Sequence, residues 1–455
     1  MSAVDEIDRD KVEEFVTSVM KGRGVPGVAV GMLYKGEIVT GGFGVTNVEH
    51  PLPVTDETLF QIGSITKTFT GTAMMRLVEM GKLELEAKVR TYVPDFKVSD
   101  ETAASQATIR HLLTHTAGWE GDVFDDTGAG DDALAKYVVK MAELKQLAPL
   151  GTVFSYCNSG FSLAGYIIEV VTGKSYQAAL KDLVMEPLGM KNSYFVPGDM
   201  MTHRFAVGQN VTEDGAKVVR PWPLPRSAWP AGGITCHVKD LLCYARFHLG
   251  DGRVNDDTRL LSAESMAQMQ SPQVTTWGDE AIGLSWGIGK VGEARRLWHS
   301  GGTTGQVSLL MLIPEHDVAI AILTNANQGG LVTQDISRGA LKEYLGLEVP
   351  DPKPIESSEE ELAQYVGRYS RPYAEIELGM LGGKLICQAT TKGGFPTKDT
   401  PPPPAPPPMS LARCEKDRLL VLDGPVKGFT VDIVRKEDGS IGWLRFGGRI
   451  HVRQA

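Results

Sequence analysis

The sequence has no excess of basic residues and no long hydrophobic run. Its 455 residues include 46 Lys and Arg against 56 Asp and Glu, which gives a formal net charge of -10 at pH 7. Without a basic block, nucleic acid is not an expected partner. No apolar run is long enough to span a bilayer, so a membrane partner is not expected either. The N-terminus, MSAVDEIDRDKVEEF, has neither the basic nor the apolar region of a secretory signal, and we expect a cytoplasmic protein.

Cysteine is scarce, and metal-ligand patterns are weak. The five cysteines are scattered, odd in number and without a CxxC pair, which is typical of reduced thiols rather than a disulfide framework. His111 and His115 have a spacing that can bind zinc on a helix. No third ligand or H-E-x-x-H glutamate accompanies them. We therefore expect two buried, hydrogen-bonded histidines, with no metal and no cofactor.

The chain is long enough for two domains. Its 42% of hydrophobic and 22% of charged residues are those of an ordinary globular protein. A proline-rich change of composition begins at Pro350. We expect a first domain over residues 1–349, a linker over 350–362 and a second domain over 363–455.

The first domain begins and ends with apolar, β-rich runs. Residues 27–33 and 37–43 read as one strand pair, and residues 307–313 and 318–324 as another. Helical patterns lie between the two pairs. This order predicts an α/β domain whose sheet is closed by both ends of the segment.

The second domain has short stretches that alternate with period two, which favours a small antiparallel barrel or sandwich. An insertion at 400–408 interrupts it, and seven of the eight residues from Pro401 to Pro408 are proline. Such a run favours polyproline II and cannot join a sheet ladder. It is interpreted as a surface loop, or else as a lid or docking segment.

Ser64-Ile65-Thr66-Lys67 opens a predicted helix that ends near Gly81. Residues three apart share a helix face, so Lys67 can reach the hydroxyl of Ser64. A lysine in a dry pocket loses its proton readily, and the helix N-terminus favours developing negative charge. Together these features activate a nucleophile. Spacing alone is weak evidence, since Ser18 and Lys21 share it in a stretch interpreted as an exposed amphipathic helix.

Tyr156-Cys157-Asn158 precedes an apolar helix over 161–171. The tyrosine oxygen can relay a proton if a nearby cation lowers its pKa. The amide of Asn158 can hold Lys67 and a substrate amide. The alternative for Tyr156 is a packing residue with a solvated hydroxyl.

His299-Ser300-Gly301-Gly302 enters the strand at 307–313. Glycine at a strand edge lets a ligand approach the backbone, which makes Gly301 a candidate substrate-binding residue. The N–H groups of Gly302 and Ser64 can form an oxyanion hole, worth a few kcal/mol per donor. The alternative for His299 is a surface strand histidine.

Gly283-Leu284-Ser285-Trp286-Gly287 matches the G-x-S-x-G nucleophile elbow, which requires a strand, a sharp turn and a helix. The glycine-broken stretch that follows is not helical. We therefore interpret it as strand and exclude Ser285 as the nucleophile.

The motifs S-x-x-K, Y-x-N and His-x-Gly, in that order, resemble the serine β-lactamase and penicillin-recognising superfamily. Flanking phrases are similar to the branch with class C β-lactamases, D-aminopeptidases, family VIII esterases and penicillin-binding-protein-type thioesterases. These phrases are FQIG at 60–63, HLLTHTAG at 111–118, EPLGM at 186–190 and AGG at 231–233. The resemblance covers about Val25 to Leu345, and the C-terminal part looks like a lipocalin-like barrel.

This resemblance implies an antiparallel sheet flanked by helices, an all-helical lobe and a small barrel. It implies that Ser64 is the nucleophile, that Lys67 and Tyr156 share acid–base work, and that Asn158 positions the substrate. His299 takes the third-motif position, where typical β-lactamases have lysine. Histidine is mostly neutral at pH 7 and anchors a substrate carboxylate less strongly than lysine.

We therefore expect a serine acyl-transfer enzyme acting on a small-molecule or peptide-like ester or amide. One alternative is a thioesterase that cyclises peptidyl substrates by aminolysis, with Arg449 binding a carboxylate. Arg449 is otherwise an ordinary exposed arginine. A weak β-lactamase and an inactive binding protein are the remaining alternatives. No oligomeric state is predicted.

Overall fold

The computed structural model describes residues 7–393, 401–402 and 404–454. The chain forms two compact units. The sheet unit comprises Met1–Ala87, Thr127–Ala135 and Phe161–Val349, and the barrel unit comprises Lys88–Asp126, Lys136–Gly160 and Pro350–Ala455. The linear domain boundaries stay a prediction. Within the described residues, no helix is long and apolar enough to cross a membrane.

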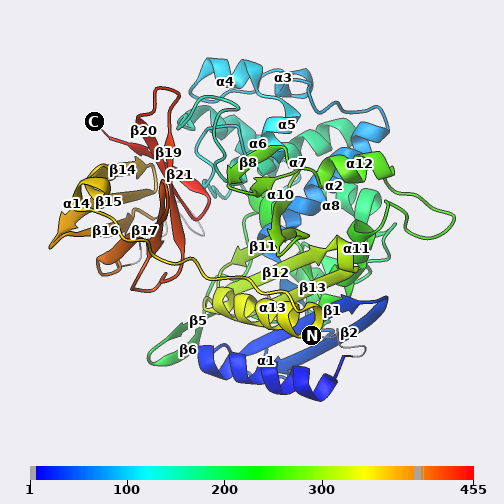
Figure 1. The fold of residues 1–455 in the computed structure, drawn as a ribbon. Coiled ribbons are helices and arrows are strands. Elements are labelled where there is room, and N and C mark those ends of the chain that lie inside the picture. The colour runs from blue at the N-terminus through cyan, green and yellow to red at the C-terminus, as the bar shows by residue number, and fades with distance from the viewer. Residues whose placement is uncertain (1–6, 394–400, 403, 455) are drawn as a thin grey trace. The chain divides into compact units, whose positions relative to one another are not determined.

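The sheet unit is built on an eight-stranded sheet with the order β2-β1-β13-β12-β11-β10-β9-β8 (Figure 1). The strands are β1 (Gly27–Tyr34), β2 (Glu37–Gly44), β8 (Val274–Trp277), β9 (Glu280–Ile282), β10 (Gly287–Val291), β11 (Ala294–Thr303), β12 (Gln306–Ile313) and β13 (Val318–Thr324). β1 pairs antiparallel with β13, so that Val28 lies opposite Thr324 and Tyr34 opposite Val318. The predicted sheet closed by both ends of the segment is confirmed.

Helices cover both faces of this sheet. On one face, Val16 of α1 (Arg9–Arg23) and Ile336 of α13 (Gly329–Leu345) share a hydrophobic core with Val30 and Ile320. On the other face, a Cβ at Gly31 would come within 2.8 Å of Leu242 in α11 (Val238–Leu249). β12 and β13 are nearly continuous Val, Ile and Leu because both of their faces are buried.

The sheet unit also contains several helices and short strands outside the large sheet. They are α2 (Thr66–Glu79), α8 (Tyr176–Leu180), α9 (Pro197–Met200), α10 (Trp229–Gly232), α12 (Ala263–Met269), β3 (Phe60–Gln61), β4 (Ser193–Tyr194), β5 (Gln209–Thr212), β6 (Gly215–Val218) and β7 (Thr235–Cys236). α2 is buried almost all round. Its threonines bond inside the protein: Thr70 donates to the carbonyl oxygen of Pro230 at 2.8 Å, and Thr72 lies 3.0 Å from the hydroxyl of Tyr244.

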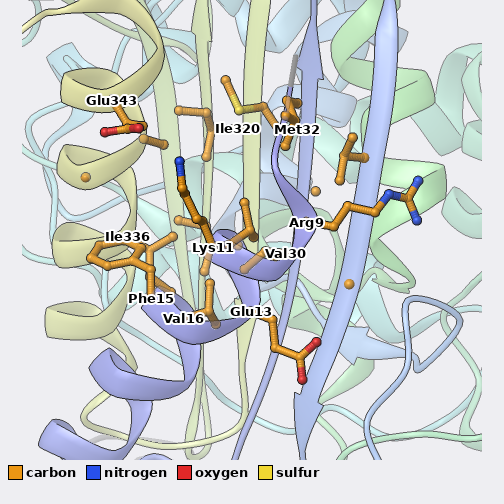
Figure 2. A pocket seen from close by; sticks show the side chains of 18 of the residues that line it. Arg9, Lys11, Glu13, Phe15, Val16, Val30, Met32, Ile320, Ile336 and Glu343 are labelled. Atoms are coloured by element: carbon orange, nitrogen blue, oxygen red, sulfur yellow. The ribbon is translucent and has the colours of Figure 1, made fainter. Parts of the chain in front are cut away.

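A cavity of about 620 Å³ lies in the sheet unit between α1, α13 and the strands β1, β2 and β13 (Figure 2). Its lining is mainly apolar, with Val16, Val30, Ile320 and Ile336 among the residues that form it. Figure 2 also shows charged side chains there, those of Arg9, Lys11, Glu13 and Glu343. None of the residues that line the cavity belongs to the three sequence motifs.

The barrel unit contains a closed eight-stranded barrel with strands in chain order. They are β14 (Gly367–Arg371), β15 (Ala374–Leu381), β16 (Lys384–Thr391), β17 (Met409–Glu415), β18 (Arg418–Val421), β19 (Thr430–Arg435), β20 (Ile441–Phe446) and β21 (Arg449–Arg453). β14 pairs with β21 and closes the barrel. The predicted barrel is confirmed. The proline insertion connects β16 to β17, and residues 394–400 and 403 lie outside the described part of the chain.

The barrel unit also contains short helices outside the barrel. They are α3 (Val89–Tyr92), α4 (Glu101–Gln106), α5 (Ile109–Leu113) and α14 (Glu359–Ala363). Two further helices, α6 (Ala133–Lys140) and α7 (Asn158–Thr172), have residues in both units. Trp443 of β20 donates its indole N–H to the carbonyl oxygen of Leu147 at 2.8 Å. Its ring shares a small core with Ala148, Val153 and Ile450, so the barrel and the segment before Tyr156 are packed together.

Candidate active site

The sheet unit places Ser64 and Lys67 within hydrogen-bonding distance. Ser64 lies in a 3-10 turn (Gly63–Ile65) that leads directly into α2, and Lys67 is on the first turn of α2. Lys67 Nζ is 3.1 Å from Ser64 Oγ. Ser18 and Lys21, which have the same spacing in α1, are both exposed. Of these two pairs, only the one at the start of α2 therefore has a buried lysine.

Lys67 is fully buried. Its ammonium group donates to the carbonyl oxygen of Ala231 at 2.6 Å and lies 5.6 Å from the centre of the Phe161 ring. Burial removes the hydration of the charged form and favours the neutral amine, whereas the carbonyl oxygen favours the charged form. Lys67 Nζ is thus desolvated and within hydrogen-bonding distance of a serine hydroxyl, an arrangement in which its neutral form can take a proton from Ser64.

Gly301 of β11 and Gly63 of the turn let the strand touch the backbone before Ser64. A Cβ at Gly301 would lie 1.9 Å from the carbonyl oxygen of Ile62. Gly63 has a φ of 52°, and a Cβ there would lie 2.6 Å from the backbone nitrogen of Gly302. The backbones of Gly63 and Gly302 are therefore adjacent, and the two N–H groups expected for the oxyanion hole belong to touching segments.

His299 lies on β11 opposite Leu310 of β12. It is buried rather than a surface strand histidine. Burial, and secondarily the charge of Lys67, lower the pKa of His299 to about 3. Its Nδ1 lies 2.6 Å from the carbonyl oxygen of Ser300, and in the neutral ring this nitrogen is the donor, which leaves Nε2 as the acceptor. His299 is therefore an uncharged imidazole at neutral pH.

The barrel unit holds the Y-x-N motif. The ring of Tyr156 stacks on His115 with 4.4 Å between the ring centres. The guanidinium carbon of Arg449 lies 4.5 Å from the centre of the Tyr156 ring, and the backbone N–H of Tyr156 donates to the carbonyl oxygen of Gly448 at 2.8 Å. A cation thus lies beside the Tyr156 ring, and it comes from the barrel.

His111 and His115 do not share a helix face. α5 ends at Leu113, and His115 follows it with a φ of 58°. His111 Nδ1 accepts from the backbone N–H of Thr108 at 3.1 Å, while His115 Nδ1 accepts from the backbone N–H of Cys157 at 2.9 Å. Each histidine therefore braces the local backbone, and His115 holds the Y-x-N segment.

Asn158 is the buried first residue of α7. Its Nδ2 donates to Asp122 Oδ1 at 2.7 Å. Burial alone would raise the pKa of Asp122, but Arg449 and Arg371 together with the Asn158 amide hold it well below its usual range. Asp122 is therefore a permanent carboxylate beside the motif.

Sequence reasoning did not identify Asp122 or Arg371. The only local signal for Asp122 is its place in the acidic, glycine-containing loop that follows the HLLTHTAG phrase. Arg371 is 249 residues away from Asp122 in the chain, so no spacing rule connects the two.

Ser285 of the G-x-S-x-G match is buried with a φ of 73°, and it precedes a strand rather than a helix. A Cβ at Gly71 would lie 2.3 Å from Ser285 Oγ, so this serine is packed against α2. It has no nucleophile-elbow geometry.

A buried lysine next to a serine at the start of a central helix, beside an antiparallel sheet, defines a serine hydrolase fold of the β-lactamase and penicillin-binding-protein type. A family model described as Beta-lactamase matches residues 12–342, and the chain belongs to this family. The predicted resemblance is confirmed, and members of the family are generally serine hydrolases.

Individual relatives match different shares of the chain. Penicillin-binding protein 4 of Amycolatopsis lactamdurans is 36% identical over 361 residues, which cover 76% of this chain and 93% of that protein. The structure of an octameric penicillin-binding protein homologue from Pyrococcus abyssi is 26% identical, with a TM-score of 0.65, over 98% of this chain and 100% of that one. The structure of SurE with D-Leu has a TM-score of 0.76 at 22% identity, over 98% of this chain and 99% of that one.

Proposed function

We propose that this protein is a serine acyl-transfer enzyme that forms a covalent ester on Ser64. The observation that carries the proposal is the 3.1 Å contact between Ser64 Oγ and the buried Nζ of Lys67, in a chain of the β-lactamase family. A serine hydroxyl held against a desolvated amine loses its proton to that amine as it attacks a carbonyl carbon.

The proposal assigns each motif a role. Lys67 and Tyr156 exchange protons with the attacking serine and the leaving group. The N–H groups of Ser64 and Gly302 stabilise the oxyanion of the tetrahedral intermediate, and Asn158 positions the acyl group. Water then attacks the Ser64 ester and releases the acid.

Esters and peptide-like amides are the proposed substrates. The neutral, buried His299 offers no charge to a substrate carboxylate, whereas β-lactam recognition by a third-motif lysine relies on that charge. Weak β-lactamase activity is therefore the less favoured alternative. We also propose that the protein is cytoplasmic and that its binding partner is the substrate alone.

Aminolysis is the second candidate reaction. The resemblance of the three motifs to those of penicillin-binding-protein-type thioesterases is the ground for it, and in this reaction an intramolecular amine of a peptidyl acyl group replaces water. In that reaction Arg449 is the proposed carboxylate-binding residue. Its guanidinium already pairs with Asp122 at 3.1 Å, so it would have to bind substrate with its remaining hydrogens.

Hydrolysis of a chromogenic short-chain ester tests the proposed function. The wild type is expected to release nitrophenol, Ser64→Ala to lose activity by about a thousandfold or more, and Ser18→Ala to retain it. A fluorophosphonate probe should label the wild type and Ser18→Ala but not Ser64→Ala. Equal lack of reactivity in wild type and Ser64→Ala would support the inactive binding protein, and loss in Ser18→Ala would mean that the other S-x-x-K is the site.

A further inference from the structure

We propose that Asp122 is a positioning residue for the Y-x-N motif, and that through Asp122 the C-terminal barrel holds this motif in its working geometry. The inference rests on the proposed function, because it assigns Asp122 a role only through Asn158 and Tyr156. It adds a residue and a structural element that none of the three motifs contains.

Asp122 collects four hydrogen bonds on its two oxygens. Oδ1 accepts from Asn158 Nδ2 at 2.7 Å and from Arg449 Nη2 at 3.3 Å. Oδ2 accepts from Arg371 Nη1 at 2.9 Å and from Arg449 Nε at 3.1 Å. A carboxylate bonded in this way has one orientation only, and hydrogen bonds to a charged acceptor are the strong ones.

This contact fixes the amide of Asn158. A carboxylate only accepts hydrogen bonds, so the amide must turn its NH₂ group towards Asp122. The amide oxygen of Asn158 then points the other way and is presented as an acceptor, with one N–H left as a donor. The orientation that a substrate amide would meet is therefore set by Asp122.

The same carboxylate holds the cation beside Tyr156. Arg449 bonds Asp122 through two nitrogens and lies over the Tyr156 ring, 4.5 Å from its centre. Without Asp122, this guanidinium would lose the partner that fixes its position. One side chain thus orients both functional members of the motif.

Both arginines come from the strands that close the barrel. Arg371 is the last residue of β14 and Arg449 is the first residue of β21, and these two strands pair with each other. Arg371 also bonds the buried carboxylate of Glu120 at 3.1 Å, so two guanidinium groups face two carboxyl groups. Such a matched buried cluster holds its geometry but is strongly destabilised when one member is removed.

The chain contains a matched control for this cluster. Asp432 in the barrel has the same 13% side-chain exposure as Asp122 and also pairs with two arginines, Arg418 at 3.1 Å and Arg445 at 3.0 Å. In the described residues the hydrogen bonds and ion pairs of Asp432 go to Arg418 and Arg445, and not to Asn158 or Arg449. Loss of its charge should therefore affect stability alone.

A double-mutant cycle on the full chain tests the proposal, with acylation of the enzyme by a nitrophenyl ester as the readout. We expect Asp122→Asn to slow acylation at least about tenfold in the wild type and by a smaller factor when Asn158 is already alanine, because only its effect through Arg449 on Tyr156 then remains. Asp432→Asn should slow acylation less than about twofold in either background. Equal effects of Asp122→Asn with and without Asn158 would overturn the positioning role.

Two measurements keep the test decisive. If Asn158→Ala acylates too slowly to follow, the acylation rates of Asp122→Asn and Asp432→Asn are compared instead. Both are measured at a temperature below the thermal unfolding midpoints of the two variants. Equal acylation rates would overturn the proposal. If Asp122→Asn does not fold, Arg371→Gln replaces it with Arg418→Gln as control, and a several-fold slower acylation of Arg371→Gln is expected. A wild type that forms no ester on Ser64 would contradict the proposed function instead, which separates the two failures.

Discussion

His299 is the residue whose surroundings bear most directly on substrate choice. Typical β-lactamases have a lysine in this position, which is cationic in water at neutral pH; here burial and the neighbouring Lys67 lower the pKa of the imidazole to about 3. The ring therefore stays neutral at every pH at which the protein is expected to work. A neutral acceptor suits an ester or amide better than an acyl donor that carries a carboxylate.

Nitrocefin should consequently be a poor substrate. We expect its turnover per active site to be at least about a hundredfold below that of a nitrophenyl ester, because no third-motif cation binds its carboxylate. Parallel absorbance assays on one enzyme preparation measure both rates. Comparable turnover of the two substrates would contradict the role given to His299.

At the scale of secondary-structure elements, the position of Ser64 depends on the contact between β11 and the turn that carries this residue. At Gly301 the strand meets the carbonyl oxygen of Ile62, whereas a Cβ at its neighbour Gly302 would meet nothing within 4 Å. Two adjacent glycines thus have different reasons to be present. Gly301 is required by close packing, and Gly302 is open on its Cβ side.

Gly301→Ala should therefore destabilise the protein by about 1 to 3 kcal/mol or more, the usual cost of overpacking. Gly302→Ala should change the free energy of unfolding by less than about 1 kcal/mol, because its methyl group enters open space. Urea unfolding followed by circular dichroism compares the two variants. The packing argument fails if both variants lose stability equally.

Local sequence signals predicted some elements well and others not at all. β1, β12 and β13 are apolar runs, and the expected strands agree with them to within one residue. β14 and β17 have no such signal, because the sequences GRYSR and MSLARCE are mixed and short. Their strand character comes from pairing, β14 with β15 and β21 and β17 with β16 and β18, which their own sequences do not encode.

The same distinction applies to the site. Ser64 and Lys67 were predicted from a spacing of three residues, and the structure places them in contact. Asp122 was not predicted, because its partners Arg371 and Arg449 lie hundreds of residues further along the chain. Motifs report local chemistry, whereas the groups that orient them depend on the tertiary fold.

Over the whole molecule, three buried histidines make stability depend on pH. Burial lowers the pKa values of His248 and His299 to about 3 and that of His451 to about 4. In the unfolded chain histidine titrates near pH 6.5, so below this pH the unfolded state binds more protons than the folded state. Stability should therefore fall as pH decreases from about 6.5 towards 3 to 4, by about 2 kcal/mol per histidine at pH 5.

The thermal unfolding midpoint should accordingly drop between pH 7 and pH 5. His248→Gln should make this pH dependence shallower. His248 is fully buried, and glutamine does not titrate, so one difference in proton binding between the folded and the unfolded protein is lost. His316→Gln, at an exposed position, should leave the slope unchanged. A midpoint that does not change over this range would show that these histidines are not held neutral.

At the scale of the whole molecule, the chain is similar to known proteins over two different lengths. The family model matches residues 12–342, whereas the likeness to SurE and to the Pyrococcus abyssi homologue covers 98% of the chain. The barrel is therefore part of what these structures share with this protein. We propose that its two arginines on Asp122 give that element the task of orienting the Y-x-N motif.

Intact-mass spectrometry of the protein after brief exposure to a panel of esters, thioesters, D- and L-peptides and β-lactams tests the central claim most directly. The account predicts a mass increase equal to one acyl group, mapped by peptide analysis to Ser64 and absent in Ser64→Ala. The adduct should form with esters or peptide-like donors faster than with β-lactams. No adduct from any donor, or an adduct on another residue, would contradict the account.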